Sequence, residues 1–119
     1  MIHFNAWFNL KPGVPEAEGI AAVARFLGGV SEVGDVAGFQ ILVNKAGPPT
    51  SKLPRYHALV RYRDDAHFAE AMRNQVQRGI HSGPHGRMTN VITDFHVEVF
   101  SSLGAPVSAP QEGLLACGI

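Results

Sequence analysis

The sequence predicts one α+β domain in which two helices cover one face of a four-stranded antiparallel sheet. A chain of 119 residues that is 45% hydrophobic and 17% charged has the size and composition of one globular domain. Four segments alternate apolar and polar residues like strands, and two repeat apolar residues at helical spacing. Their order, β-α-β-β-α-β, is that of ferredoxin-like folds with β-strands one and three in the middle.

The N-terminal part of the chain predicts the first strand and the first helix. Residues 2–10 alternate strictly between an apolar and a more polar side, and Lys11-Pro12-Gly13 ends the strand because proline cannot donate a hydrogen bond. Residues 15–33 begin with a proline suited to a first helical turn and carry an apolar stripe. These residues predict the first helix, and the pair Gly28-Gly29 weakens its last turns, so an end at the glycine pair is the alternative.

The middle of the chain predicts two strands joined by a long loop. Residues 38–46 and 55–62 both alternate, and each is rich in β-branched or aromatic side chains. Between them, the proline- and glycine-rich stretch 46–54 reads as a loop.

The C-terminal part predicts the second helix and the last strand. Residues 64–78 form the helix, capped by an aspartate, and residues 79–87 form a loop that carries two histidines. Residues 89–100 alternate again and form the fourth strand. The domain therefore covers residues 1–100, and the small-residue and proline-rich stretch 101–119 is expected to be a tail.

Charge and cysteine content exclude several classes of function. Ten Lys and Arg residues balance ten Asp and Glu residues, which argues against binding of nucleic acid or an anionic membrane. Cys117 is the one cysteine, so no disulfide can form within the chain. No signal peptide or long apolar run is visible, so we expect a cytoplasmic protein.

The two sides of the predicted sheet differ in character. One side is strongly apolar and the other mixes histidine, asparagine, tryptophan and charged residues. Helices that cover the sheet need the apolar side, which would leave the mixed side for solvent, a second subunit or a ligand. The reverse assignment, with the mixed side lining a pocket beneath the helices, stays open at this level.

Residues 2–100 resemble the dimeric α+β barrel superfamily in length, strand order and strand patterning. Within them, Trp7–Gly13, Tyr56-His57 and the Gly79–His85 loop look similar to a group of small bacterial proteins of unknown function. The superfamily includes antibiotic-biosynthesis-type monooxygenases, stress-response A/B-barrel proteins, small polyketide cyclases and muconolactone isomerases. The resemblance implies a homodimer whose two sheets pair into a barrel. It also implies a small-molecule pocket between sheet and helices in each subunit.

His57 is the first candidate for catalysis because it lies mid-strand on a predicted central strand. It shares a face with Trp7 and Asn9. Trp7 would form a wall of the pocket, and Asn9 and His85 would polarise or protonate the substrate. A histidine is suited to accept a proton near neutral pH, and polyketide cyclases of the superfamily use a pocket histidine in this way. The alternative is a half-buried histidine without a catalytic role, whose ring is hydrogen-bonded to the backbone or to a residue of a neighbouring strand.

His81 and His85 lie on the loop before the last strand, and either could act as the acid to a His57 base. His85 is the better candidate because it is nearer that strand. On the mixed side, Arg61 and Asp94 could bind a substrate carboxylate or orient a histidine. The alternative is that these are surface residues and cross-strand ion pairs.

A transition-metal site on His3, His57 and His96 is a further alternative, because these residues fall on the same face of three adjacent predicted strands. Asp94 could orient one of these ligands. The arrangement depends on strand register, and no local metal-binding motif supports it.

Three hypotheses about function follow. The first is an enzyme without a cofactor, of cyclase, isomerase or monooxygenase type, acting on a small aromatic or polyketide-like molecule with a histidine base. The sequence has no glycine-rich phosphate loop, so we expect no nucleotide cofactor. The second is a metal- or ligand-binding protein without catalysis, and the third is a stress-response interaction module. The sequence leaves the substrate and the reaction open.

Overall fold

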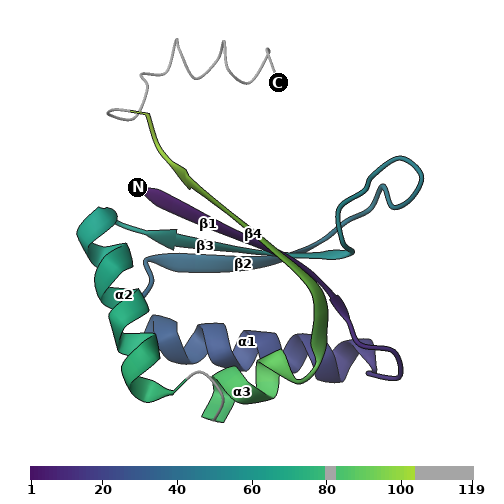
Figure 1. Ribbon diagram of the computed structural model, residues 1–119, viewed down its shortest axis with the longest axis horizontal. Helices are drawn as coiled ribbons and strands as arrows, with labels where there is room; N and C mark the ends of the chain where they lie inside the picture. The colour runs from purple at the N-terminus through teal and green to yellow at the C-terminus, as the bar shows by residue number, and fades with distance from the viewer. Residues whose placement is uncertain (80–82, 104–119) are drawn as a thin grey trace.

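A computed structural model describes residues 1–79 and 83–103, which form a four-stranded sheet with three helices on one side (Figure 1). The elements are β1 (Ile2–Leu10), α1 (Glu16–Glu32), β2 (Gly38–Val43), β3 (Tyr56–Tyr62), α2 (Asp65–Arg78), α3 (Gly83–Thr89) and β4 (Ile92–Ser101). All pairings are antiparallel and the strand order is β2-β3-β1-β4. The predicted ferredoxin-like fold, with β1 and β3 at the centre, is confirmed.

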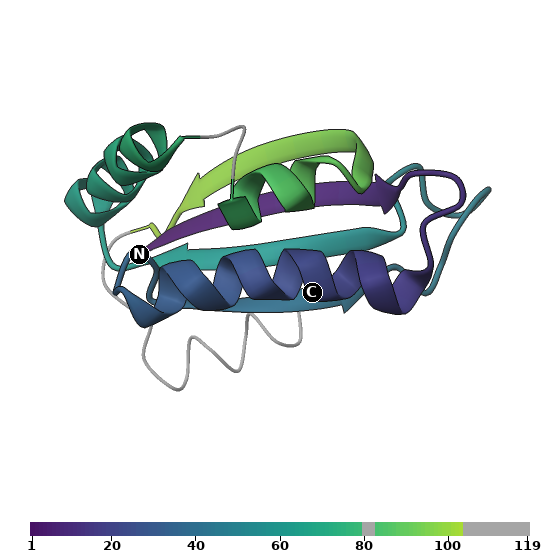
Figure 2. The same cartoon turned by 90° about the horizontal axis from the view of Figure 1, so that it is seen from below.

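The apolar side of the sheet lies beneath the helices (Figure 2). The register places Phe4 opposite Val60 and Ala6 opposite Ala58, so the apolar sets of the two central strands share this face. The buried core residues are Ile2, Ala6, Phe8, Val23, Leu27, Val30, Val36, Tyr56, Ala58, Val60, Tyr62, Ala71 and Ile92. The mixed set therefore points away from the helices, which resolves the choice that the sequence left open. We call this side the outer face.

The first helix covers most of the predicted range 15–33 and does not end at its glycine pair. It runs to Glu32, and Gly28 and Gly29 lie within it. Each glycine costs about 1 kcal/mol relative to alanine in a helix interior. Leu27 and Val30 are buried on either side of the pair. Their packing on the sheet offsets that cost, so the helix end is set by tertiary contacts.

A third helix was missed at the sequence level. Part of the predicted loop 79–87 belongs to α3, which packs next to α1. Its sequence contains glycines and a proline, which are typical of loops, and so it did not predict a helix. Pro84 occupies the first turn, where a missing N–H does no harm, and Gly86 is buried.

A bulge in β4 also departs from the predicted alternation. The pairing between β1 and β4 shifts register between Trp7 and Asn9, and Asp94 adopts a positive φ of 54°. A bulge inserts one residue, so the residues on its two sides change faces. Ile92 is therefore buried in the core, although strict alternation placed it on the mixed side with His96.

His67 is buried and connects α2 to the rest of the fold. Its Nδ1 accepts the backbone N–H of Arg63 at 3.0 Å, so the ring proton is on Nε2. Nε2 donates it to the carbonyl of Gly34 at 2.8 Å. Asp64 caps the helix, as predicted, and accepts the backbone N–H of His67 at 2.8 Å. This histidine thus ties the start of α2 to the turn between α1 and β2.

Replacing His67 by alanine is expected to lower the free energy of unfolding by about 1–3 kcal/mol, because both backbone groups lose a buried partner. Urea unfolding followed by circular dichroism measures the change. Glu70→Ala, at an exposed position of the same helix, is the control and should stay within about 0.5 kcal/mol of the parent protein. Equal midpoints for the two variants would contradict this role of His67.

Candidate functional site

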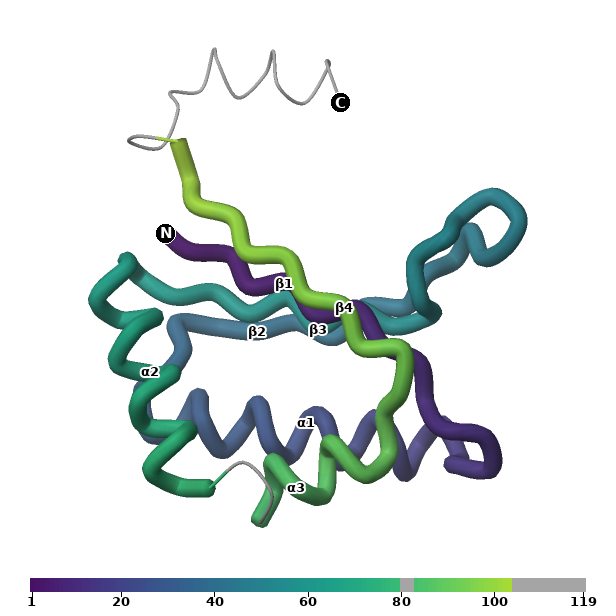
Figure 3. The backbone as a smooth tube through the Cα atoms, viewed as in Figure 1, coloured from purple at the N-terminus to yellow at the C-terminus, as the bar shows by residue number. Residues whose placement is uncertain are grey.

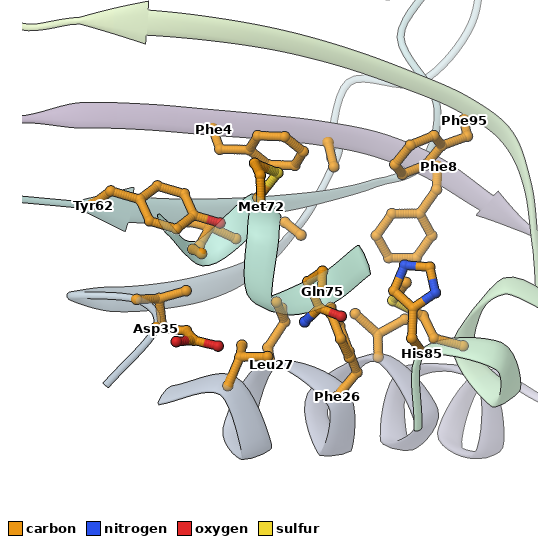
Figure 4. A pocket seen from close by; sticks show the side chains of 18 of the residues that line it. Phe4, Phe8, Phe26, Leu27, Asp35, Tyr62, Met72, Gln75, His85 and Phe95 are labelled. Carbon is orange, nitrogen blue, oxygen red and sulfur yellow. The ribbon is translucent and has the colours of Figure 1, made fainter. Parts of the chain in front are cut away.

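A cavity of about 340 Å³ lies between the sheet and the helices. Its wall is made mostly of aromatic and aliphatic side chains, including Phe4, Phe8, Phe26, Met72 and Phe95 (Figure 4). Val76 on α2 and Phe95 on β4 line the cavity and are also exposed, at 74% and 55%. The cavity therefore reaches solvent beside these two side chains.

Four polar side chains interrupt the apolar wall, and they come from four different parts of the chain. These are Asp35 in the turn before β2, Tyr62 at the end of β3, Gln75 on α2 and His85 on α3. In Figure 4, Asp35 and Tyr62 are at one end of the cavity and His85 is at the other, with Gln75 between them. An apolar pocket with a few convergent polar groups is the usual form of a small-molecule site.

Asp35 is buried and is held by two side chains of α2. Asn74 donates its amide to Oδ1 at 2.9 Å, and Arg78 donates to Oδ2 at 2.6 Å. Burial and the charge of Asp35 raise the pKa of Tyr62 to about 12. The Tyr62 hydroxyl is therefore protonated at neutral pH and can donate a hydrogen bond into the cavity.

His85 is the one predicted catalytic residue that lines this cavity. Its ring forms a T-shaped contact with that of Phe26, with the centroids 5.0 Å apart and the planes at 78°. A smaller cavity of about 220 Å³ adjoins the first and shares Phe26, Gln75 and His85 with it. The imidazole thus lies where both spaces can be reached, in a position to exchange a proton with a bound molecule.

His57 and Trp7 lie on the outer face, across the sheet from the cavity. Their rings stack, with centroids 4.6 Å apart and planes at 19°. Asn5 donates its amide to the carbonyls of His3 and Glu98, so its Oδ1 accepts the Nε2–H of His57 at 2.9 Å. The predicted neighbourhood of His57 and Trp7 is present, but the expected pairing of His57 with His85 in one site is wrong because the sheet separates them.

The three histidines of the metal alternative share the outer face but do not come together. Trp7 is paired with His57 on one side and with His96 on the other, so its indole separates them. His96 instead approaches Glu98, with Nε2 and Oε2 3.4 Å apart, and His3 pairs with Ser102 at 3.1 Å. Across residues 1–79 and 83–103, no three His, Cys, Asp or Glu side chains are placed to hold a metal ion.

Asn9 and Asp94 form a pair beside the long β2–β3 connection, which projects beyond the sheet (Figure 3). Asn9 donates its amide to Asp94 at 2.9 Å and accepts the backbone N–H of Arg55 at 2.8 Å. The pair thus joins the bulge of β4 to the end of that connection. Arg61 is also on the outer face and lies against Gly38, where an added Cβ would be 2.6 Å from its Nη2. His81 lies outside the described residues.

Asp35, Tyr62 and Gln75 were not among the candidates predicted from the sequence. The alternation of residues 55–62 puts Tyr62 on the apolar side of its strand, and helical spacing puts Gln75 on the apolar stripe of residues 64–78. Neither pattern assigns a role to the residue. Asp35 belongs to a short turn in which an aspartate is commonplace. The one available signal was a polar residue on an otherwise apolar face, which marks Tyr62 and Gln75 but not Asp35.

A comparison with protein-family models gives one assignment. The model of DUF6614, a family of unknown function, matches residues 1–115. The chain belongs to this family. No curated protein matches its sequence. Among the described residues, no helix has the length and apolar character needed to cross a membrane.

Solved structures share the fold at low sequence identity. A dabb family protein with a ferredoxin-like fold from Mesorhizobium loti has a TM-score of 0.65 and 16% identity, covering 87% of this chain and 97% of its own. SnoaB, a cofactor-independent oxygenase from Streptomyces nogalater, has a TM-score of 0.63 and 15% identity, covering 92% and 96%. A dimeric ferredoxin-like protein of unknown function from Jannaschia sp. has a TM-score of 0.57 and 17% identity, covering 86% and 100%. The resemblance to this group is confirmed at the level of fold.

The environment of His57 predicts a dependence of stability on pH. Burial lowers the pKa of His57 from its ordinary value of 6.5, so folding favours the neutral ring. Its contribution to stability is present above about pH 6.5 and is lost as the pH falls through the lower pKa of the folded state. His57→Phe keeps an aromatic ring on Trp7 and removes the titration.

We therefore expect the melting temperature of the parent protein to fall by about 2 °C more than that of His57→Phe between pH 7.5 and pH 5.5. The effect is small because the ring is partly solvated. Both proteins are melted at one concentration under scanning calorimetry. Parallel pH dependences would show that the titration of His57 is not linked to folding.

Proposed function

We propose that this protein is a cofactor-independent enzyme that binds a small aromatic or polyketide-like molecule in the cavity, with His85 as the base. The observation that carries the proposal is an imidazole in the wall of an apolar cavity of about 340 Å³. A cavity of this size suits a small hydrophobic ligand. SnoaB, which shares the fold, is a cofactor-independent oxygenase, and this supports the class of reaction by analogy of fold.

Cyclisation, isomerisation and oxygenation of an electron-rich ring can all begin with the same step. A C–H or O–H bond next to a carbonyl or an aromatic ring breaks, its electron pair stays on the substrate, and the proton moves to a base. In the proposal His85 accepts that proton and later returns it to the product or to water. The imidazolium so formed offsets the negative charge on the substrate. The Gln75 amide can donate a hydrogen bond to the negatively charged substrate. His57 has no part in this step.

We further propose that the protein is a homodimer formed through the outer face. All three helices lie on the opposite side of the sheet, so this face has no cover within residues 1–79 and 83–103 (Figure 2). Leu42 and Phe100 project from it and are 42% and 57% exposed. A second copy would bury these side chains with the Trp7–His57 stack, and the Jannaschia protein of the same fold is dimeric.

Proton abstraction can be tested without knowledge of the natural substrate. The probe is 2-tetralone, a bicyclic ketone, and NMR follows the exchange of its C–H protons for deuterium next to the carbonyl in D₂O. We expect the protein to accelerate this exchange and His85→Ala to slow it about a hundredfold, because a positioned general base contributes roughly 10²–10⁴. Arg87→Ala, at an exposed position of the same helix, should exchange at the parent rate.

The site of exchange is checked by filling the cavity. Ala58 is buried and lines it, so Ala58→Leu should abolish the accelerated exchange. The same substitution at exposed Ala69 on α2 should leave the rate unchanged. Exchange that survives both His85→Ala and Ala58→Leu would place the chemistry elsewhere and overturn the proposal.

The homodimer makes a separate prediction. Leu42→Glu introduces a carboxylate on the outer face, where burial in a dimer without a partner charge would cost several kcal/mol. We expect the parent protein to sediment as a dimer and Leu42→Glu as a folded monomer, whereas Ala69→Glu should remain dimeric. A monomeric parent protein at tens of micromolar would refute this part of the proposal.

A further inference from the structure

Asp35 gives the cavity a distinctive electrostatic character. Among the described residues that line it, Asp35 is the one Asp, Glu, Lys or Arg side chain. Its partner Arg78 is outside this lining, and the Arg78 side chain is 46% exposed whereas that of Asp35 is 10% exposed. Water therefore screens the positive member of the pair more than the negative one. A molecule in the cavity meets the carboxylate end of the pair.

Tyr62 offers a hydrogen bond at the same end. Within the described residues its hydroxyl makes no hydrogen bond, although the side chain is buried and faces the cavity (Figure 4). Asp35 and Tyr62 line the same end of the cavity, and burial and the charge of Asp35 both raise the pKa of this phenol. This end thus combines one donor with a negative potential.

We propose that Asp35 makes the Tyr62 end of the cavity selective for a neutral hydrogen-bond acceptor, such as a ketone or quinone carbonyl, and against a carboxylate or phenolate. The inference rests on the proposed function and specifies the substrate class. Tyr62 would hold a carbonyl oxygen that does not take part in the reaction. The charge that develops when His85 removes a proton is then placed at the other end of the cavity, away from Asp35. A substrate of this kind carries oxygens at two separated positions on an aromatic frame.

The test uses three probes that share a naphthalene ring and differ in charge. They are 2-acetonaphthone, which is neutral, 2-naphthoate, which is anionic, and 2-naphthylmethylamine, which is cationic. Their affinities for the parent protein and for Asp35→Asn are measured at pH 7.5 by NMR titration. The carboxylate loses hydration in both proteins, so this cost cancels when the two proteins are compared.

We expect Asp35→Asn to bind 2-naphthoate about tenfold more tightly than the parent protein does and the amine less tightly, with the ketone changed by less than about twofold. Equal ratios of the three affinities in the two proteins would overturn the role of Asp35 and leave the proposed function intact. Failure of the parent protein to bind any probe in the cavity, judged against Ala58→Leu, would overturn the proposed function and this inference with it.

A second variant covers the case in which Asp35→Asn does not fold. Arg78→Gln removes the cation that partly compensates Asp35, and it keeps an amide that can donate to the carboxylate. The ratio of the affinity for 2-acetonaphthone to the affinity for 2-naphthoate should then be severalfold higher than in the parent protein. An unchanged or smaller ratio would count against the inference.

Discussion

The attachment of α2 is the constraint on which the cavity depends. His67 and Ala71 are its buried residues, and Phe68 and Met72 pack against the core from the same helix. The ring of Phe68 contacts Tyr62 on β3, with the centroids 5.0 Å apart. Polar contacts to the turn before β2 also hold α2: His67 bonds to Gly34, and Asn74 and Arg78 bond to Asp35. The small side chain of Ala71 lines the cavity and leaves space between α2 and β3.

The sheet divides the molecule into two chemical environments because side chains alternate along each strand. On β1, Phe4, Ala6 and Phe8 line the cavity, whereas His3, Asn5 and Trp7 point the other way. The histidines are distributed accordingly. His85 reaches the cavity from α3, and His57 stacks on Trp7 at the face proposed for dimerisation. In the proposal one face carries the reaction and the other carries assembly, and a substitution on one face need not disturb the other.

Much of the fold was predictable because strict alternation and helical spacing depend on local periodicity. The first strand, the capped second helix and the strand order all follow from it. The bulge at Asp94 was not predictable, because a single inserted residue leaves no compositional trace. The site was harder still. His85 was recognised, but the turn residue Asp35 acquires its meaning from partners 39 and 43 residues away. Contacts of that kind are set by tertiary structure, which also decided which sheet face the cavity uses.

The pair formed by Asp35 and Arg78 joins stability to selectivity. Burying a charged pair costs desolvation, and replacement of such pairs by apolar residues is often neutral or stabilising. Stability alone therefore does not require a carboxylate at this position, and an apolar contact could hold α2 in place. The Asp35 carboxylate lies in the wall of the cavity, whereas Arg78 is outside the lining, so the carboxylate has an electrostatic effect that an apolar contact would not have. It imposes a negative potential beside the Tyr62 donor, so the residue that fixes the wall also restricts what the cavity accepts.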